Sequence, residues 1–289
     1  MTPLSERAAL VVLLRTGGRP WRAYADLVEE AGSATEVLAR ESAQVSLLER
    51  TSDLIGLAER EITGWEAAGL HLLTVLDQDY PENLRAVHDR PPLLFCSGSL
   101  EPADDRAVAV VGARRASPSG IAAAGALARH LTTSGFTVVS GLAVGIDTAA
   151  HTGALATGGR TLAVIGTGLK RAYPPQNAAL QRRIAAECAV VSQFWPDSPP
   201  SRQSFPMRNA VISGLSLATV VVESSQTGGS RLQARLALEH GRPVFLWHRL
   251  LDQPWARDFA RRPGVRVAHS GEEITSALAR LSATGTLVA

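Results

Sequence analysis

The spacing of apolar residues divides the chain into parts with different patterns. Up to residue 70, apolar side chains recur every three or four positions, and glycines separate the runs. One such run consists of Leu54, Leu57, Ala58, Ile62 and Trp65. This spacing predicts a small all-helical N-terminal domain over residues 1–70.

A connector follows over residues 71–103. It contains two short apolar runs, 71–76 and 93–96, which we expect to form strands. Pro91 and Pro92 precede the second run. Because proline fixes its own φ and keeps the preceding residue extended, the pair predicts an extended path into the next domain.

From residue 104 to 289, continuous apolar runs alternate with amphipathic segments. Such runs are typical of parallel strands that helices cover on both faces. The predicted strands are 107–111, 136–140, 161–165, 188–192, 218–222 and 243–247. The first predicted helix has Ser117 as its N-cap and Gly135 just past its end, and the others lie at 147–157, 176–186, 206–213, 229–240 and 271–282. This alternation predicts an α/β fold with a doubly wound, mainly parallel sheet.

Composition narrows the class of protein. The chain is 45% hydrophobic with a mean hydropathy of +0.05, as expected of a soluble globular protein. No apolar run approaches the roughly 20 residues of a membrane helix, and the N-terminus lacks a secretory leader pattern. The two cysteines, Cys96 and Cys188, cannot form a disulfide framework or a multi-cysteine metal site. We therefore expect a cytoplasmic protein without a membrane partner.

The formal net charge of +2 conceals an uneven distribution. Residues 1–100 contain 9 basic and 15 acidic side chains, whereas residues 106–249 contain 15 basic and 5 acidic ones. This surplus predicts an anionic partner for the second domain. Every basic residue except Lys170 is arginine, which suits bidentate phosphate binding, although a GC-rich genome produces the same bias.

Glycine-bearing loops follow four of the predicted strands. In parallel sheets, ligands bind at the carboxyl ends of strands, where glycine lets backbone N–H groups approach a phosphate and helix N-termini add partial positive charge. We therefore predict a phosphate-binding edge built from these loops. Its candidate residues are Gly112, Arg114, Arg115, Ser117, Ser140, Gly141, Gly145, Gly166, Gly168, Lys170, Gly229 and Ser230.

Motifs of common nucleotide enzymes are missing. The first strand lacks the Gly-x-Gly-x-x-Gly fingerprint of NAD-binding proteins, and Lys170 lies outside a P-loop. Asp147 and His151, one helical turn apart, can form either an acid–base pair or a structural hydrogen bond, and Glu223 is the remaining acid at a strand end. No nucleophile, base and orienting group come together, so we predict binding rather than catalysis, with no catalytic residue, metal ion or cofactor.

Aromatic residues and arginines alternate within residues 194–209. Phe205 lies near Arg208, and Phe194 and Trp195 open the segment. Aromatic faces beside guanidinium groups are typical of single-stranded nucleic-acid sites. Phe194 and Trp195 can equally fasten the segment to the sheet.

The chain resembles the DNA-processing protein A (DprA/Smf) family. The motifs that carry the resemblance occur in matching order at 111–117, 141–151, 163–169, 173–177, 205–209 and 212–216, with further similarity at 80–84 and 91–95. The resemblance implies an extended Rossmann-like fold that binds single-stranded DNA, forms a homodimer and delivers the DNA to RecA during natural transformation, without hydrolytic activity. It also implies DNA contacts at Arg114, Phe205, Arg208 and Asn209.

The chain departs from the family pattern at three places, and we expect no C-terminal winged-helix domain. Pro175-Gln176 stands where family members often carry a basic residue before the asparagine. Residues 228–233 read Gly-Gly-Ser-Arg-Leu-Gln where the family has Ser-Gly-Ser-Leu-Ile-Thr, and residues 246–249 read Leu-Trp-His-Arg in place of Val-Pro-Gly. These differences keep other interpretations open. The chain can be a nucleotide-binding sensor or nucleotide hydrolase on the same fold, or a DprA-like protein of a defence or mobile-element system.

Overall fold

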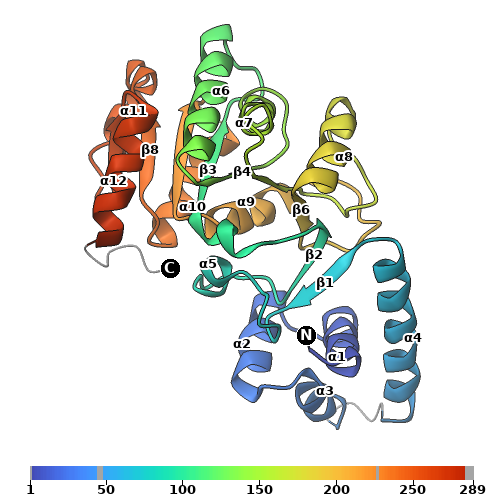
Figure 1. Ribbon diagram of the computed structural model, residues 1–289. Helices are drawn as coiled ribbons and strands as arrows, with labels where there is room; N and C mark the ends of the chain where they lie inside the picture. The colour runs from blue at the N-terminus through green and yellow to red at the C-terminus, as the bar shows by residue number, and fades with distance from the viewer. Residues whose placement is uncertain (1, 44–47, 226–227, 284–289) are drawn as a thin grey trace.

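A computed structural model of the chain describes residues 2–43, 48–225 and 228–283. Helices occupy the N-terminal segment, as the apolar spacing predicts, and form a module at one end of the molecule (Figure 1). They are α1 (Leu4–Thr16), α2 (Trp21–Ala31), α3 (Ala34–Ala43) and α4 (Leu48–Ala67). None of the helices in the described ranges combines the length and the apolar character needed to span a bilayer.

The rest of the chain is built on one nine-stranded sheet. Its strands are β1 (His71–Thr74), β2 (Leu93–Gly98), β3 (Ala107–Gly112), β4 (Thr137–Ser140), β5 (Thr161–Val164), β6 (Ala189–Ser192), β7 (Ala218–Glu223), β8 (Val244–Trp247) and β9 (Val265–Ala268). They lie in the order β1-β2-β6-β5-β4-β3-β7-β8-β9. All neighbours from β6 to β9 are parallel, whereas β2 is antiparallel to both β1 and β6. The predicted α/β class and the mainly parallel, doubly wound sheet are confirmed.

Helices cover both faces of the sheet. They are α5 (Glu82–Arg85), α6 (Pro118–Thr133), α7 (Ile146–Leu155), α8 (Ala178–Glu187), α9 (Ser204–Gly214), α10 (Gly229–Glu239), α11 (Pro254–Phe259) and α12 (Gly271–Ala283). Val108 and Val110 of β3 pack with α6, α7 and α12, whereas Ala107 and Ala109 face the core that includes α9 and α10. This alternation explains why β3 reads as a continuous apolar run.

The first helix of the sheet domain shows how the sequence sets its boundaries. The Ser117 side chain accepts a hydrogen bond from the Gly120 N–H, and Pro118 occupies the first turn. Gly135 follows the helix with a φ of +77°, a conformation that glycine adopts without strain. Both ends of α6 therefore lie where the capping residues predict them.

The strand order creates one switch point in the sheet. From β3 the chain moves outward through β4, β5 and β6, and then returns to place β7 on the other side of β3. The loops after β3 and β7 therefore diverge to opposite faces at neighbouring positions. In open α/β sheets this is where ligands bind.

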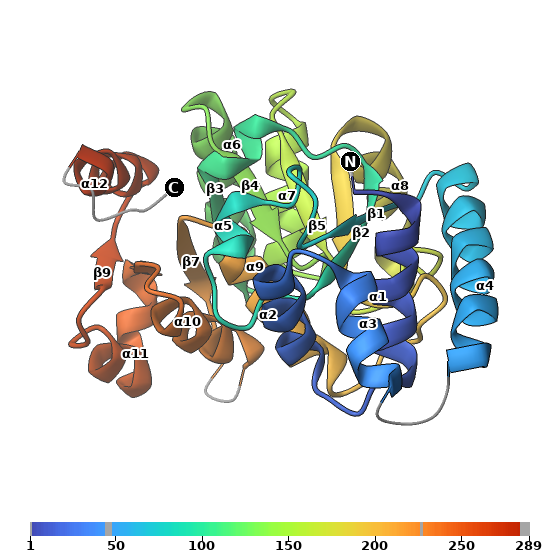
Figure 2. The same cartoon turned by 90° about the horizontal axis from the view of Figure 1, so that it is seen from below.

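An aromatic cluster fastens the helical module to the sheet domain. Trp195, in the loop after β6, lies 5.4 Å from Trp21, 6.1 Å from Trp65 and 6.0 Å from Phe95 between ring centroids. The Arg15 guanidinium lies 4.8 Å from the Trp195 ring. The sequence allows Trp195 either to stack on nucleic acid or to fasten its segment to the sheet. The structure supports fastening, and Trp195 contacts the helical module as well as the sheet. Figure 2 shows the helical module beside the sheet domain from a second direction.

Candidate nucleic-acid interface

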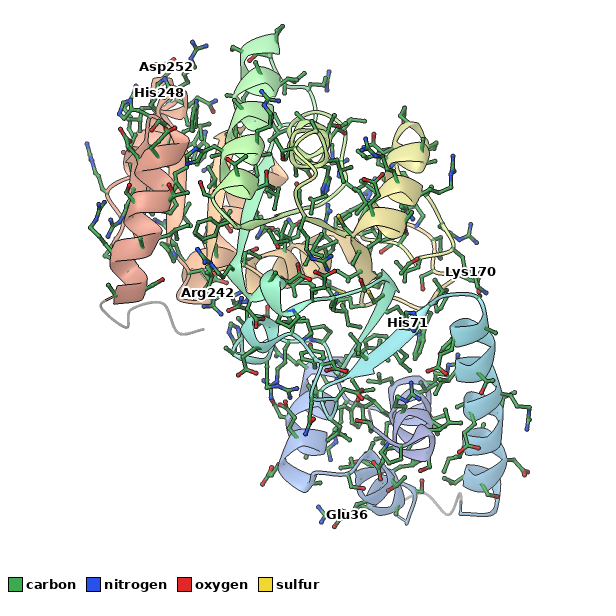
Figure 3. All side chains as sticks on the ribbon, viewed as in Figure 1. Glu36, His71, Lys170, Arg242, His248 and Asp252 are labelled. Carbon is green, nitrogen blue, oxygen red and sulfur yellow. The ribbon has the colours of Figure 1, made fainter. Side chains whose placement is uncertain are left out.

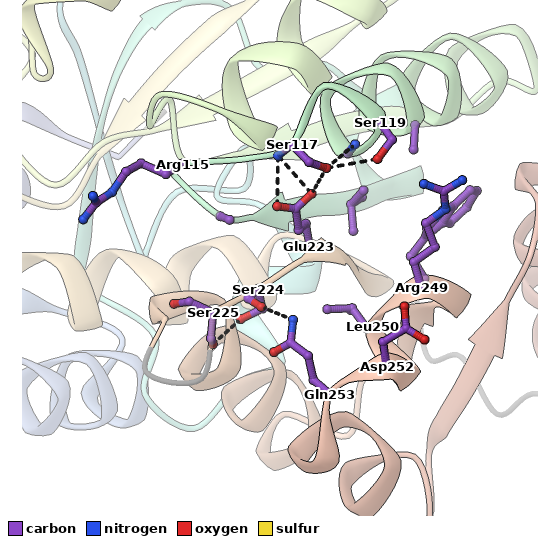
Figure 4. Close-up of a pocket in the computed structure, with 15 residues that line it drawn as sticks. Arg115, Ser117, Ser119, Glu223, Ser224, Ser225, Arg249, Leu250, Asp252 and Gln253 are labelled. Atoms are coloured by element: carbon purple, nitrogen blue, oxygen red, sulfur yellow. Dashed lines mark hydrogen bonds between the residues drawn. The ribbon is translucent and has the colours of Figure 1, made fainter.

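Two adjoining cavities lie at the switch point between β3 and β7. The larger one, which we call the cleft, has a volume of about 550 Å³ and lies between the loop after β3, α9 and the start of α10. The smaller one, the side pocket, has about 310 Å³ and lies between the start of α6 and the 3-10 helix His248–Asp252 (Figure 4). Ala113, Arg115 and Ser225 line both cavities. The position matches that predicted for a ligand.

Two aromatic rings and a guanidinium group border the cleft, and we call them the aromatic platform. It consists of Tyr173 and Arg114, which are exposed, and Phe205, which is half-buried. The Arg114 guanidinium lies 5.3 Å from the Phe205 ring centroid, and the Tyr173 ring lies 5.7 Å from it. Gly166 supports the platform, because a Cβ at that position would approach Phe205 to 3.0 Å. The platform offers a base both a stacking face and a neighbouring positive charge.

Arg208 has a different place from the one that the sequence predicts. Its side chain is buried, and the guanidinium donates to the carbonyl oxygens of Gly141 and Val164, the latter at 2.9 Å. Burial lowers the pKa of Arg208 to about 10, which leaves it charged at neutral pH. The sequence predicts a direct phosphate ligand, but the structure buries Arg208 beneath the cleft, where its Nη1 holds two strand ends together and its Nε has no partner within the described residues.

Asp147 occupies the amide groups of the loop after β4. Its carboxylate accepts from the N–H of Gly141 at 3.1 Å and of Ala143 at 3.4 Å. Burial raises the pKa of Asp147, and the charge of Arg208 and the bonds from the loop amides act against that rise. The glycine loop is thus filled by a carboxylate of the protein itself.

Glu223 occupies an amide group of the loop after β3. Its carboxylate accepts from the Ser117 N–H at 3.0 Å and from the Ser117 hydroxyl at 2.7 Å (Figure 4). The N-terminus of α6 therefore has a carboxylate where a phosphate could bind. Arg115, by contrast, is exposed and extends away from Glu223 (Figure 4).

Several residues predicted to bind phosphate instead form hydrogen bonds or close contacts within the protein. Ser140 is fully buried and donates to the Val110 carbonyl at 2.6 Å, and the Ser230 hydroxyl lies 2.7 Å from that of Ser224. A Cβ on Gly168 would approach the carbonyl oxygens of Trp195 and Pro196 to 2.1 and 2.2 Å. For Ser140, Gly168 and the Ser230 hydroxyl, close packing and internal hydrogen bonds therefore use the groups that were predicted to bind phosphate.

Other predicted residues lie outside the cleft. Gly145 begins α7 with a φ of +86°, and a Cβ there would come within 2.3 Å of the Ala113 carbonyl oxygen. Lys170 is exposed, pairs with Asp197 at 3.1 Å, and lies on the opposite side of the molecule from Asp252 (Figure 3). The predicted residues that do meet around the cleft are Gly112, Arg114, Arg115, Phe205, Arg208, Asn209, Gly229 and Ser230. Gln226 and Thr227 of the same predicted loop lie outside the described residues.

His151 and Asp147 do not form an acid–base pair. The His151 Nδ1 lies 2.7 Å from the Thr161 hydroxyl, which in turn donates to the Val138 carbonyl at 2.7 Å. Since that hydroxyl proton is used, the imidazole donates from Nδ1. Burial lowers the pKa of His151 to about 3. The structure therefore supports the structural interpretation of this histidine.

Sequence reasoning missed two residues of this region. Tyr173 joins the platform through the fold of the loop after β5, which a linear pattern does not reveal. Gln233 lines the cleft from α10, and the only signal for it was the departure from the family pattern at 228–233.

Comparisons with known proteins agree with this architecture. The family model described as DNA recombination-mediator protein A matches residues 71–262. Protein Smf of Synechocystis is 39% identical over 207 residues, which cover 70% of this chain and 50% of that protein. The chain thus spans about half the length of that curated relative.

Two solved structures are similar as well. DNA processing protein A (DprA) from Streptococcus pneumoniae has a TM-score of 0.75 and 29% identity, covering 95% of this chain and 98% of that one. DNA processing protein A from Helicobacter pylori, described with its single-stranded DNA binding mode, has a TM-score of 0.65 and 26% identity, covering 73% and 96%. The chain belongs to the DNA recombination-mediator protein A family, known as DprA or Smf.

Proposed function

We propose that this protein binds single-stranded DNA along the cleft and the aromatic platform as part of DNA processing in recombination or transformation. The observation that carries the proposal is the aromatic platform of Tyr173, Phe205 and the Arg114 guanidinium beside a 550 Å³ cleft. The basic surplus of residues 106–249 and the description of the Helicobacter pylori relative support it.

The geometry favours unpaired strands over duplex. A base can reach the Phe205 face only when it is unpaired, since the bases of a duplex stack on one another. Arg114 and Arg115 are exposed and can neutralise phosphates on either side of a stacked base. Because Asp147 and Glu223 occupy the amides of Gly141, Ala143 and Ser117, the exposed side chains supply contacts that these amides do not.

The proposal includes no turnover of DNA or nucleotides. The Asp147 carboxylate is enclosed by loop amides, and Glu223 is bound to Ser117. The Ser117 hydroxyl that donates to Glu223 also accepts from the Gly120 N–H as the cap of α6, so we propose a structural role for both side chains. A nucleotide hydrolase or sensor is less well supported, because Glu223 and Asp147 already occupy amides of the loops after β3 and β4, where such folds hold a nucleotide phosphate.

The wider role follows from the family. We propose that the protein acts in the cytoplasm as a homodimer and passes its strand to RecA. These parts of the proposal rest on the resemblance carried by the motifs at 111–117 and 205–209 rather than on a surface seen in the structure.

The test is a titration of fluorescent oligo-dT and of a hairpin duplex over a salt series. We expect tighter binding of the single strand and a steep loss of affinity with salt, because phosphate contacts release counterions. Arg114→Ala should weaken binding by about ten- to a hundredfold, as loss of a charged hydrogen bond typically does. Arg60→Ala, at an exposed arginine on α4 of the helical module, is the matched control. Equal affinity for duplex, or equal effects of the two substitutions, contradicts the proposal.

A further inference from the structure

Gln233 is a buried amide without a partner in the wall of the cleft. It lies in the first turns of α10 and is 1% exposed. Neither its Oε1 nor its Nε2 has a hydrogen-bond partner within the described residues, and the same holds for the Nε of Arg208, which lines the cleft as well. Buried polar groups without partners destabilise a fold, so their retention at one site needs a reason.

A second buried glutamine, Gln181 on α8, is held differently. Its Nε2 donates to the Arg171 carbonyl at 3.1 Å, whereas its Oε1 has no partner within the described residues. One of its two polar atoms thus has a structural use, whereas neither polar atom of Gln233 has one.

The chemistry of an amide indicates its ligand. A glutamine side chain presents one acceptor and two donors in a plane, and it matches a flat ligand edge that carries an adjacent donor and acceptor. Nucleobases have such edges. Among them adenine, with its N6 donor and N7 acceptor, is the base with which Asn and Gln pair bidentately.

We infer that Gln233 reads the edge of one unpaired base of the bound strand, with a preference for adenine. The inference rests on the proposed binding of single-stranded DNA and adds base recognition to it. The platform binds any base by its face, whereas Gln233 lies beside the loop residues Gly228 and Gly229 in the same cleft and meets the edge of a base that enters it. The 550 Å³ volume is large enough for a purine.

The test compares an oligo-dT with the same oligonucleotide carrying one central adenine. The unsubstituted protein should bind the adenine-containing strand about five- to a hundredfold more tightly, the range of one bidentate base contact. Gln233→Leu, which replaces the amide with an apolar group of similar size, should bind both strands with the affinity that the parent shows for oligo-dT. It should also raise the melting temperature, because it removes two unpaired buried groups.

Four results separate this inference from the proposed function. Gln181→Leu, the matched control, should lower the melting temperature and leave the adenine preference intact. Binding of both strands without a preference, or a preference that survives in Gln233→Leu, overturns base recognition and leaves strand binding standing. A lower melting temperature of Gln233→Leu with unchanged selectivity assigns the amide a structural role and overturns the inference too. Failure to bind either strand refutes the proposed function itself.

Discussion

Acidification should destabilise this protein through His151. Its imidazole is fully buried between α7 and the sheet, and burial lowers its pKa from 6.5 to about 3. The folded chain therefore takes up this proton only near pH 3, whereas the unfolded chain takes it up near pH 6.5. A depressed pKa of this kind contributes stability that is present above the unfolded value and is lost as the pH falls toward the folded value.

The magnitude follows from the width of that window. Acidification from about pH 7.5 to about pH 5 covers about 1.5 pH units below the pKa of His151 in the unfolded chain. Each of these units lowers the free energy of unfolding by about 1.36 kcal/mol. The free energy of unfolding should thus fall by about 2 kcal/mol from His151 alone. Asp147, whose pKa burial raises, contributes in the opposite direction, so the histidine must be isolated by substitution.

Urea unfolding at the two pH values measures the effect. His151→Asn keeps an amide donor near the Thr161 hydroxyl but cannot be protonated, so its loss of stability on acidification should be smaller than that of the parent by about 2 kcal/mol. His71→Gln, at an exposed position on β1, is the control and should behave like the parent. If His151→Asn and the parent lose equal stability, the buried imidazole accepts a proton in the folded protein and the reasoning is refuted.

Two further substitutions test the parts of the structure that support the site. Asp147→Asn should lower the free energy of unfolding by about 3–5 kcal/mol, because it leaves the buried Arg208 without a nearby negative charge, whereas Asp197→Asn at an exposed ion pair should cost less than about 1 kcal/mol. Equal effects in urea titrations would contradict this. Trp195→Ala should cost about 3 kcal/mol and speed proteolysis of the helical module, since it removes the centre of the aromatic cluster; a digestion pattern like the parent's counts against that role.

The strands of the sheet could be predicted because their burial leaves a direct trace in the sequence. A parallel strand covered on both faces must be apolar at consecutive positions, and 107–111 and 218–222 are such runs. The caps of α6 were equally visible, since Ser117 and Gly135 act within one turn. The antiparallel addition of β2 to β6 was not predictable, because strand pairing across the sheet leaves no local pattern.

The site could be predicted only in part, for a related reason. The sequence places Gly112, Gly141 and Ser117 at the correct edge of the sheet, but it does not show which groups already have partners. Asp147 and Glu223 take those amides from positions six and 106 residues away. Exposure is also invisible in a linear motif, so Arg114 and Arg208 appeared equivalent although one is exposed and the other is buried.

The two internal carboxylates help to explain what kind of ligand this fold can accept. A free nucleotide depends on a few phosphate contacts with backbone amides, and in the loops after β3 and β4 the amides of Ser117, Gly141 and Ala143 already hold Glu223 and Asp147. A further phosphate at Ser117 would meet the negative charge of Glu223. A polymer depends less on these backbone amides. It places many phosphates near the exposed guanidinium groups of Arg114 and Arg115 and stacks its bases on Phe205. The arrangement therefore favours a long, single-stranded ligand held by side chains over a short one held by the backbone.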